Sequence, residues 1–146
     1  CLRDGQCAVI DFQDAVLGPI TYDFVSLIKD CYITRSQKEV EYLTKRYREQ
    51  LIRKKLLSET YDQAIFFRWI DFMGLQRHLK VLGIFSRLHL RDEKPVYLNH
   101  LPLVLNYVFD AVSGHADSNP LMKEFCNYLE RFVKPIAAKQ LWMKTS

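Results

Sequence analysis

Apolar residues recur every three or four positions through most of the chain after residue 20, and this spacing predicts amphipathic helices. Capping residues mark two helix starts: Thr21 ahead of Asp23, and Ser36 with Glu39 three positions later, which is the pattern of a capping box. Pro135 should interrupt or bend the last helix. We expect helices over residues 21–31, 36–55, 98–112 and 121–142. A long helix should also run from Ser58 or Thr60 to beyond residue 88, and residues 114–120 should form a loop.

The beginning of the chain has a different pattern. Asp4-Gly5 favours a two-residue hairpin turn, and residues 6–12 are a plausible returning strand. The first strand of that hairpin would precede Asp4, where only three residues stand, and the sequence does not begin with methionine. We therefore expect a mainly α, single-domain fold over residues 1–146 with a short β-hairpin, forming the C-terminal piece of a longer protein.

The helix expected up to and beyond residue 88 is apolar on nearly all of its faces, which predicts that it is buried among other helices. At about 100° per residue, polar and aromatic side chains fall along one stripe, with Arg77 beside it. The stripe consists of Trp69, Met73, Gln76, Lys80 and Arg87. Either it lines a pocket for a polar ligand, or its basic groups reach solvent and pair with carboxylates of neighbouring helices.

Composition excludes several classes of protein. No apolar run approaches the ~18–20 residues of a membrane span. The 4 cysteines and 4 histidines lack the paired spacing of a disulfide framework or a zinc site. We expect reduced thiols and a cytoplasmic protein that binds no membrane and no nucleic acid.

The net charge of +4 is concentrated in residues 35–55, where eight basic residues stand against three acidic ones. This segment could bind an anionic partner. We favour the other interpretation, the solvated face of a helix, since Val40, Leu43, Tyr47 and Leu51 keep an apolar stripe at helical spacing.

The stretch "VIDFQDA", residues 9–15, places Asp11 and Asp14 at the end of an apolar run. Carboxylates on rigid backbone are ligands that a hard divalent cation prefers, and such a cation commonly bridges nucleotide phosphates. Aspartate is also common in turns, where it would only cap the chain reversal. The residues alone leave both interpretations open.

Residues 9–32 resemble the metal-binding region of the aminoglycoside phosphotransferase family, whose members have a protein-kinase-like fold. The family pattern is hydrophobic-Ile-Asp-aromatic-x-x-Ala, then a loop with glycine and proline, then Tyr-Asp, which stands here as Tyr22-Asp23. Residues 68–108 resemble bacterial kinases that phosphorylate the anomeric position of N-acetylmuramate and N-acetylglucosamine in cell-wall sugar recycling. The resemblance implies the helical C-terminal lobe of an α+β kinase fold that uses ATP and Mg²⁺.

The resemblance also implies roles for single residues. Asp11 would bind Mg²⁺ with Asp14 as a second candidate, and Asp23 would brace the catalytic loop. The residues at the positions of the family's acceptor-sugar wall are Trp69, Asp71, Gln76, Arg77 and Lys80.

The family's catalytic loop, His-x-Asp followed by an asparagine, and its nucleotide-binding lobe should lie upstream of Cys1. We therefore expect no general base within residues 1–146 and no activity of this chain by itself. The main hypothesis is a sugar kinase whose partners are ATP and a sugar. The alternative is a non-catalytic, pseudokinase-like helical module that binds a partner through residues 35–55.

Overall fold

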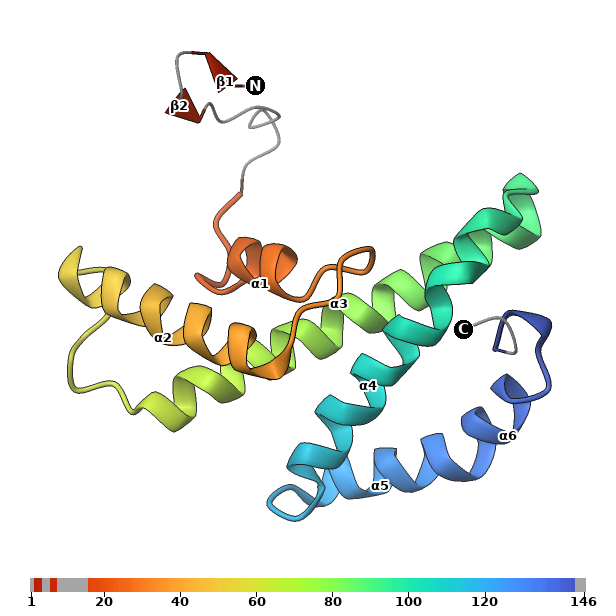
Figure 1. Ribbon diagram of the computed structural model, residues 1–146. Helices are drawn as coiled ribbons and strands as arrows, with labels where there is room; N and C mark the ends of the chain where they lie inside the picture. The colour runs from red at the N-terminus through yellow and green to blue at the C-terminus, as the bar shows by residue number, and fades with distance from the viewer. Residues whose placement is uncertain (1, 4–5, 8–15, 144–146) are drawn as a thin grey trace.

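The computed structural model describes residues 2–3, 6–7 and 16–143. Two short strands, β1 (Leu2–Arg3) and β2 (Gln6–Cys7), pair antiparallel with Leu2 opposite Cys7. The turn at Asp4-Gly5 and the longer returning strand expected through residue 12 lie outside the described residues, as do Asp11 and Asp14. The remainder is mainly helical (Figure 1), in agreement with the predicted fold class.

The helices follow the predicted order. They are α1 (Tyr22–Ile28), α2 (Gln37–Arg53), α3 (Gln63–Asp92), the 3₁₀ helix η1 (Pro95–His100), α4 (Leu101–Ala116), α5 (Pro120–Tyr128), the π-helical turn η2 (Leu129–Val133), α6 (Lys134–Ala137) and the 3₁₀ turn η3 (Leu141–Met143). The interruption expected near Pro135 is present, because η2 breaks the α-helical register directly before α6. None of the helices within the described residues has the length and apolarity needed to cross a membrane.

Local signals explain most helix boundaries. The predicted capping box is confirmed: the Ser36 hydroxyl accepts from the Glu39 amide, and the Glu39 carboxylate accepts from the Ser36 amide at 2.8 Å. The third predicted start was wrong, because α3 is capped by Asp62, whose carboxylate accepts from the Ala64 and Ile65 amides. Helix α3 ends at Asp92, because the next residue, Glu93, has a left-handed backbone (φ 54°).

One expected loop is helical at its start. Residues 114–116 continue α4, and the loop before α5 is confined to residues 117–119. The cause is packing, since α4 lies along α3 and α5 and buries one face through Val108 and Val112. This packing extends α4 far enough to bring His115 against Asp71 of α3.

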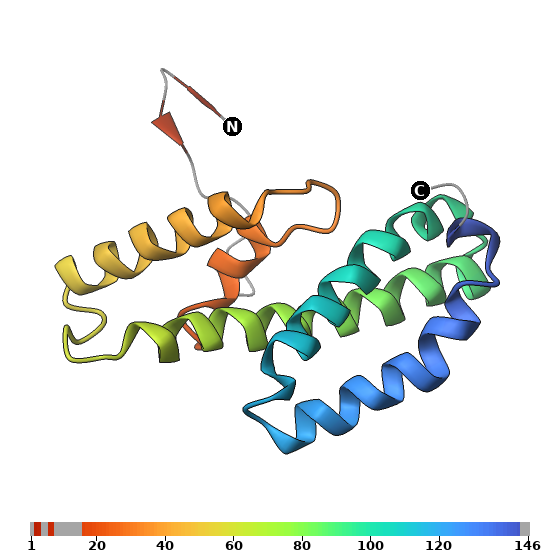
Figure 2. The same ribbon diagram turned by 60° about the horizontal axis from the view of Figure 1, so that its bottom comes forward.

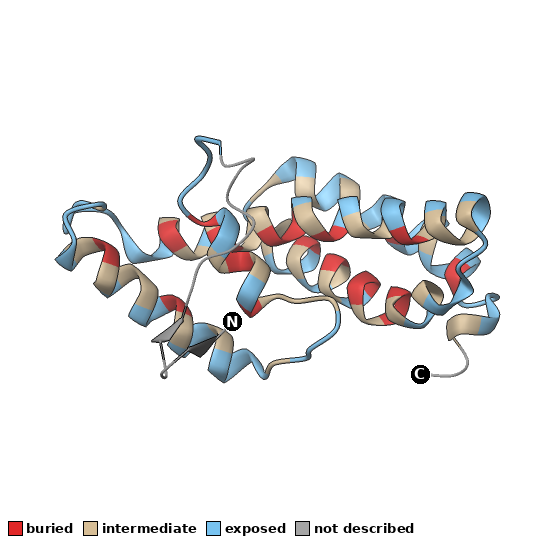
Figure 3. Ribbon diagram, turned by 90° about the horizontal axis from the view of Figure 1, so that it is seen from above, coloured by how far each residue is buried: buried red, intermediate tan, exposed pale blue. Residues whose placement is uncertain are grey.

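Helix α3 is the central element of the molecule (Figures 1 and 2). Helices α1 and α2 pack on its N-terminal part, and η1 and α4 pack along the rest, with α5 against α4. Figure 3 shows the buried positions along α3 and α4. The expectation that α3 is surrounded by other helices is therefore confirmed.

Two apolar clusters meet along α3. The first contains Val25, Ile28, Leu51, Phe66 and Ile70, and joins α1, α2 and the start of α3. The second joins α3, α4 and the C-terminal helices through Leu75, Val108, Val112 and Leu129. Polar contacts of α3 with neighbouring helices lie close to this boundary, at Asp71 and His78.

Candidate functional site

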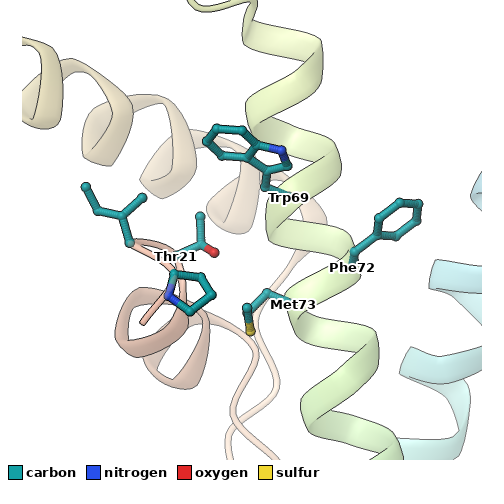
Figure 4. A pocket seen from close by; sticks show the side chains of 6 residues that line it. Thr21, Trp69, Phe72 and Met73 are labelled. Carbon is teal, nitrogen blue, oxygen red and sulfur yellow. The ribbon is translucent and has the colours of Figure 1, made fainter. Parts of the chain in front are cut away.

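An aromatic hollow of about 510 Å³ lies between the start of α1 and one face of α3 (Figure 4). It is lined by Pro19, Ile20, Thr21, Trp69, Phe72 and Met73. We call this set the aromatic hollow. Its volume is in the range of small-ligand sites in proteins. No charged side chain is among these lining residues.

The turn before α1 is held in place from α2. The Tyr47 hydroxyl donates to the Ile20 carbonyl at 2.7 Å, and the Tyr47 ring stacks on Phe24 of α1 with centroids 4.0 Å apart. The Tyr22 amide donates to the Pro19 carbonyl at 3.0 Å, closing the turn. The Pro19–Thr21 wall of the hollow is therefore fixed against the first apolar cluster.

Thr21 occupies the predicted N-cap position of α1, but its side chain makes no capping hydrogen bond. The residue is only 2% exposed, and its carbonyl accepts from the Val25 amide at 2.9 Å. Its backbone at φ −88°, ψ −12° is already helical, which turns the hydroxyl away from the helix amides. Figure 4 shows that hydroxyl pointing toward α3, between Trp69 and Met73.

Trp69 forms the aromatic side of the hollow. Its ring packs against Tyr61 at 4.8 Å and Phe66 at 6.2 Å between centroids, which fixes its orientation. Phe72 points to the side of α3 away from Thr21, and its ring meets the edge of His115 at 5.0 Å.

A second, polar cleft of about 590 Å³ lies on the opposite face of α3, among α1, α2 and α4. Asp71 lies at the centre of this cleft. Its Oδ1 accepts a hydrogen bond from Lys29 Nζ at 2.7 Å, and its Oδ2 lies 3.1 Å from His115 Nε2. Three helical elements are thereby joined at one carboxylate: the end of α1, α3 and the last turn of α4. The sequence predicted basic groups of α3 paired with carboxylates of neighbouring helices, whereas here the carboxylate belongs to α3 and its partners come from α1 and α4.

Gly74 makes room for this contact, because a Cβ there would lie 2.9 Å from Cδ of Lys29. One turn further along α3, His78 is buried and its Nε2 lies 3.0 Å from the Lys29 carbonyl. Its ring stacks on Tyr107 with centroids 4.8 Å apart. Burial lowers the pKa of His78, and the nearby Lys29 and Arg77 charges lower it further, so the ring is neutral and donates to the carbonyl.

The five residues predicted for the acceptor wall do not share one hollow. Trp69 borders the aromatic hollow, whereas Asp71 lies in the polar cleft. Gln76 and Lys80 are exposed further along the Trp69 face. The guanidinium of Arg77 lies over the ring of Tyr22, 4.8 Å from its centroid.

Asp23 is exposed in the first turn of α1, and its carbonyl accepts from the Ser26 hydroxyl at 2.6 Å. Its bracing role therefore stays a prediction. Among the described residues, no group of three or more His, Cys, Asp or Glu side chains is placed to hold a metal ion.

Sequence reasoning missed three site residues: Thr21, Lys29 and His115. Thr21 was interpreted only as a cap, and Lys29 and His115 stand 42 and 44 residues from Asp71 along the chain. The one available signal for Thr21 was the Gly18-Pro19 break just before it. Such breaks form exposed turns, and turns often carry binding residues.

The basic segment has the amphipathic form that its apolar stripe predicted. Val40, Leu43, Tyr47 and Leu51 all belong to the first apolar cluster. Lys38, Lys45, Arg46 and Arg53 are exposed on the other side of α2.

The chain was then compared with known proteins. Residues 1–65 match the sequence model of the phosphotransferase enzyme family. The N-acetylmuramate/N-acetylglucosamine kinase of Neisseria meningitidis serogroup B is 44% identical over 121 residues, which is 82% of this chain and 36% of that protein. The proteins of the same name from Pseudomonas putida and Pseudomonas aeruginosa are 42% and 41% identical over 71% and 77% of this chain, and 30% and 33% of their own lengths.

The resemblance drawn from residues 9–32 and 68–108 is therefore confirmed, since the chain is similar both to the phosphotransferase enzyme family and to the amino-sugar kinases named above. The chain spans about a third of the length of these curated relatives. No solved structure matches the chain.

Proposed function

We propose that the chain forms part of an ATP- and Mg²⁺-dependent phosphotransferase that phosphorylates a hydroxyl of a sugar or amino sugar, of the type used in cytoplasmic cell-wall sugar recycling. The observation that carries the proposal is the 41–44% identity to three proteins named as N-acetylmuramate/N-acetylglucosamine kinases. The phosphotransferase match over residues 1–65 supports the same class of reaction and includes Asp11, Asp14 and Asp23.

Mg²⁺ would be held by Asp11, with Asp14 in a supporting position. Carboxylate oxygens are the donors that Mg²⁺ prefers, and when bound the ion neutralises charge on the ATP phosphates. Both residues lie outside the described residues, so this assignment rests on the sequence pattern of residues 9–15. Asp23 would brace the catalytic loop that the family pattern places upstream.

The acceptor sugar would bind at the aromatic hollow, where Trp69 offers its ring. Pyranose rings have an apolar face of C–H groups that packs on an aromatic side chain, and their hydroxyls bind the polar groups around it. In this arrangement Asp71 acts indirectly, because it fixes Lys29 at the end of α1. Arg77 likewise fixes Tyr22, the residue that follows Thr21. Gln76 and Lys80 would contact a sugar only if it extended along α3.

The test uses the complete gene product that contains residues 1–146. It is incubated with Mg-ATP and a panel of N-acetylglucosamine, N-acetylmuramate, glucosamine, glucose and an aminoglycoside, and the products are identified by phosphorus NMR. We expect a sugar phosphate from at least one of the two N-acetylated sugars. A folded, ATP-binding protein that phosphorylates none of the panel would contradict the proposal and favour a non-catalytic helical module.

A further inference from the structure

Arg48, in the second half of α2, has a buried side-chain nitrogen without a hydrogen-bond partner. Within the described residues only two side chains have such an atom, Arg48 at Nε and His89 at Nδ1. None of the ion pairs in the described part of the chain includes Arg48. A buried donor without a partner destabilises the folded protein, so the guanidinium is held in place at an energetic cost.

The hydrogen bond that Arg48 does make reaches out of its own helix. Its Nη2 donates to the backbone carbonyl of Tyr61, 13 residues further along the chain. Tyr61 lies in the loop of residues 54–62 that joins α2 to α3 (Figure 2). Within that loop, the Tyr61 amide donates to the Ser58 carbonyl at 3.1 Å, while the side chain is 39% exposed. Arg48 therefore ties this part of the loop to the body of α2.

Tyr61 in turn restrains Trp69. The centroids of the two rings lie 4.8 Å apart and their planes are tilted by 54°. The second described ring neighbour of Trp69 is Phe66, which belongs to α3 itself. Tyr61 thus supplies the described ring contact that comes from outside the helix. It is not one of the described residues that line the aromatic hollow, so it supports Trp69 from behind without bordering the ligand's space.

The contributions of Arg48 to stability nearly cancel. A hydrogen bond from a charged donor stabilises the folded state by about as much as an unpaired buried donor destabilises it. An apolar side chain at position 48 would make neither contribution, and replacing buried polar groups by apolar ones of similar shape is often neutral or stabilising. Stability therefore gives little reason for a guanidinium here, whereas the position of Tyr61 depends on it.

We propose that Arg48 is a positioning residue for the aromatic hollow: through Tyr61 it sets the orientation of the Trp69 ring against which a ligand packs. This inference rests on the proposed function, in which the ligand is the acceptor sugar, and adds to it a residue that lies outside the hollow. A ring that is already held in its binding orientation does not have to be ordered when the sugar arrives. Arg48 therefore raises the affinity for the sugar and takes no part in phosphoryl transfer.

The experiment labels the complete gene product that contains residues 1–146 with a fluorotryptophan and follows Trp69 by fluorine NMR. The Trp69 resonance is identified by its absence from Trp69→Phe. Arg48→Leu removes the guanidinium, and Arg48→Lys keeps a charged donor for the Tyr61 carbonyl. Arg46→Leu is the matched control: it removes the same charge from α2, and Arg46 donates only within that helix, to the Tyr42 hydroxyl at 3.2 Å.

N-acetylglucosamine and N-acetylmuramate are titrated into each variant to obtain Kd from the Trp69 resonance, and KM and kcat are measured with the same sugars. In Arg48→Leu we expect the resonance to move and the Kd and KM for the sugar to rise about three- to tenfold, the effect of ordering one side chain on binding. The kcat and the KM for ATP should stay within about twofold of the parent. Arg48→Lys should restore most of the affinity, and Arg46→Leu should match the parent.

A second variant, Tyr61→Leu, reaches the same contact from its other end, because it keeps the backbone carbonyl and removes the ring. It should raise the Kd as Arg48→Leu does, and the double variant should be no weaker than either single one, since both act through one contact. Melting curves show which variants are folded, and Tyr61→Leu decides the question if Arg48→Leu is not. An unmoved Trp69 resonance, a parental Kd, or an equal rise in Arg46→Leu would overturn the inference.

The binding measurement separates this inference from the proposed function. If Arg48→Leu weakens sugar binding but the parent phosphorylates no sugar, the proposed function fails and the role of Arg48 in binding stands. If the parent phosphorylates sugars and Arg48→Leu has parental Kd and KM, the proposed function stands and this inference fails. A parent that neither binds nor phosphorylates either sugar would contradict both.

Discussion

On one face of α3, Asp71 and His78 meet Lys29 and His115 in a cleft where the polar groups already bind one another. On the other face, Trp69 borders a hollow of similar size whose described lining residues are mostly apolar or aromatic. Both hollows are large enough for a small ligand. They differ in the chemistry of their described lining, which is charged and polar in the first hollow and mostly apolar in the second.

This difference links the polar cleft with the stability of the fold and the aromatic hollow with ligand binding. In the polar cleft, a ligand would have to compete with contacts that hold α1, α3 and α4 together. In the aromatic hollow, a ligand would pack against Trp69 and Met73 without displacing an ion pair of the described residues.

The largest effect should come from Asp11, the residue proposed to hold Mg²⁺. Asp11→Asn keeps the size of the side chain and removes the charge that a hard cation requires. In the complete gene product we expect kcat to fall on the order of 10³-fold, the scale of losing one strong electrostatic contact in an active site. The measurement is steady-state kinetics over a Mg²⁺ titration.

Two controls sharpen that result. Asp14→Asn should lower kcat less than Asp11→Asn does, because the family pattern makes Asp11 the principal ligand. Asp117→Asn, at an exposed position after α4, should have no effect. A folded Asp11→Asn protein with near-parental kcat would remove the basis for calling this protein a metal-dependent kinase.

A second prediction tests the structural interpretation of the polar cleft. Lys29→Met keeps most of the apolar stem and removes the contact with Asp71, so the free energy of unfolding should fall by about 1–2 kcal/mol. For a chain of this size, that lowers Tm by about 2–4 °C per kcal/mol. The preference among sugars should not change. Thermal and urea unfolding measure the first expectation, and the sugar panel measures the second.

Lys134→Met is the matched control. Lys134 pairs with Glu130 at 2.8 Å on the surface, with both side chains about half exposed. Exposed pairs of this kind contribute about 0–1 kcal/mol, so its loss should be hardly measurable. Equal destabilisation by the two variants would mean that the Lys29–Asp71 contact is also only a surface pair.

The order of the helices could be predicted because their signals are local. The capping box at Ser36 and the interruption near Pro135 depend on a few neighbouring residues, and both are present. The start of α3 at Gln63, capped by Asp62, and the extension of α4 to Ala116 were missed. At these two boundaries, the choice among possible capping residues or the packing against other helices decides where the helix starts or ends. The spacing of apolar residues alone does not indicate which residue that will be.

The site could be predicted only in part. Helical periodicity correctly placed Trp69 and Met73 on one face of α3, but Gln76 and Lys80 on the same face lie beyond the hollow. Whether a residue on this face of α3 borders the hollow depends on which segment packs against it. Here that segment is the turn at residues 19–21, about 50 positions earlier in the chain. The contacts of Lys29 and His115 with Asp71 are equally remote in sequence and give no periodic signal.

A third prediction concerns the pH dependence of the polar cleft. Burial lowers the pKa of folded His78 below its value in the unfolded chain, so the unfolded state binds the proton more readily. The stability that neutral His78 contributes is therefore present above the unfolded pKa of about 6.5 and is lost as the pH falls from there through the folded pKa. Lys29 and Arg77, which face the ring, act in the same direction.

His78→Gln tests this, because glutamine can donate to the Lys29 carbonyl and does not titrate. The free energy of unfolding, measured between pH 5 and 8, should fall less steeply below about pH 6.5 in the variant than in the parent. His89→Gln is the control, since His89 lies further along α3 outside the polar cleft. If the two variants give the same pH slope as the parent, His78 is not held neutral by the cleft.

The smallest effects should come from the two polar residues that share the Trp69 face without bordering its hollow. Gln76 and Lys80 are exposed, and surface substitutions of this kind usually change stability by less than about 0.5 kcal/mol. We expect Gln76→Ala and Lys80→Ala to keep kcat/KM for every sugar within about twofold of the parent, which steady-state kinetics can resolve. Trp69→Ala, measured beside them, should lower kcat/KM by a larger factor, because it removes an aromatic surface at the hollow itself. A tenfold loss in Gln76→Ala or Lys80→Ala, with unchanged melting, would show that the acceptor wall continues along α3. The aromatic hollow would then be one end of a longer groove, and the boundary drawn here after Met73 would have to move toward the C-terminal end of the helix.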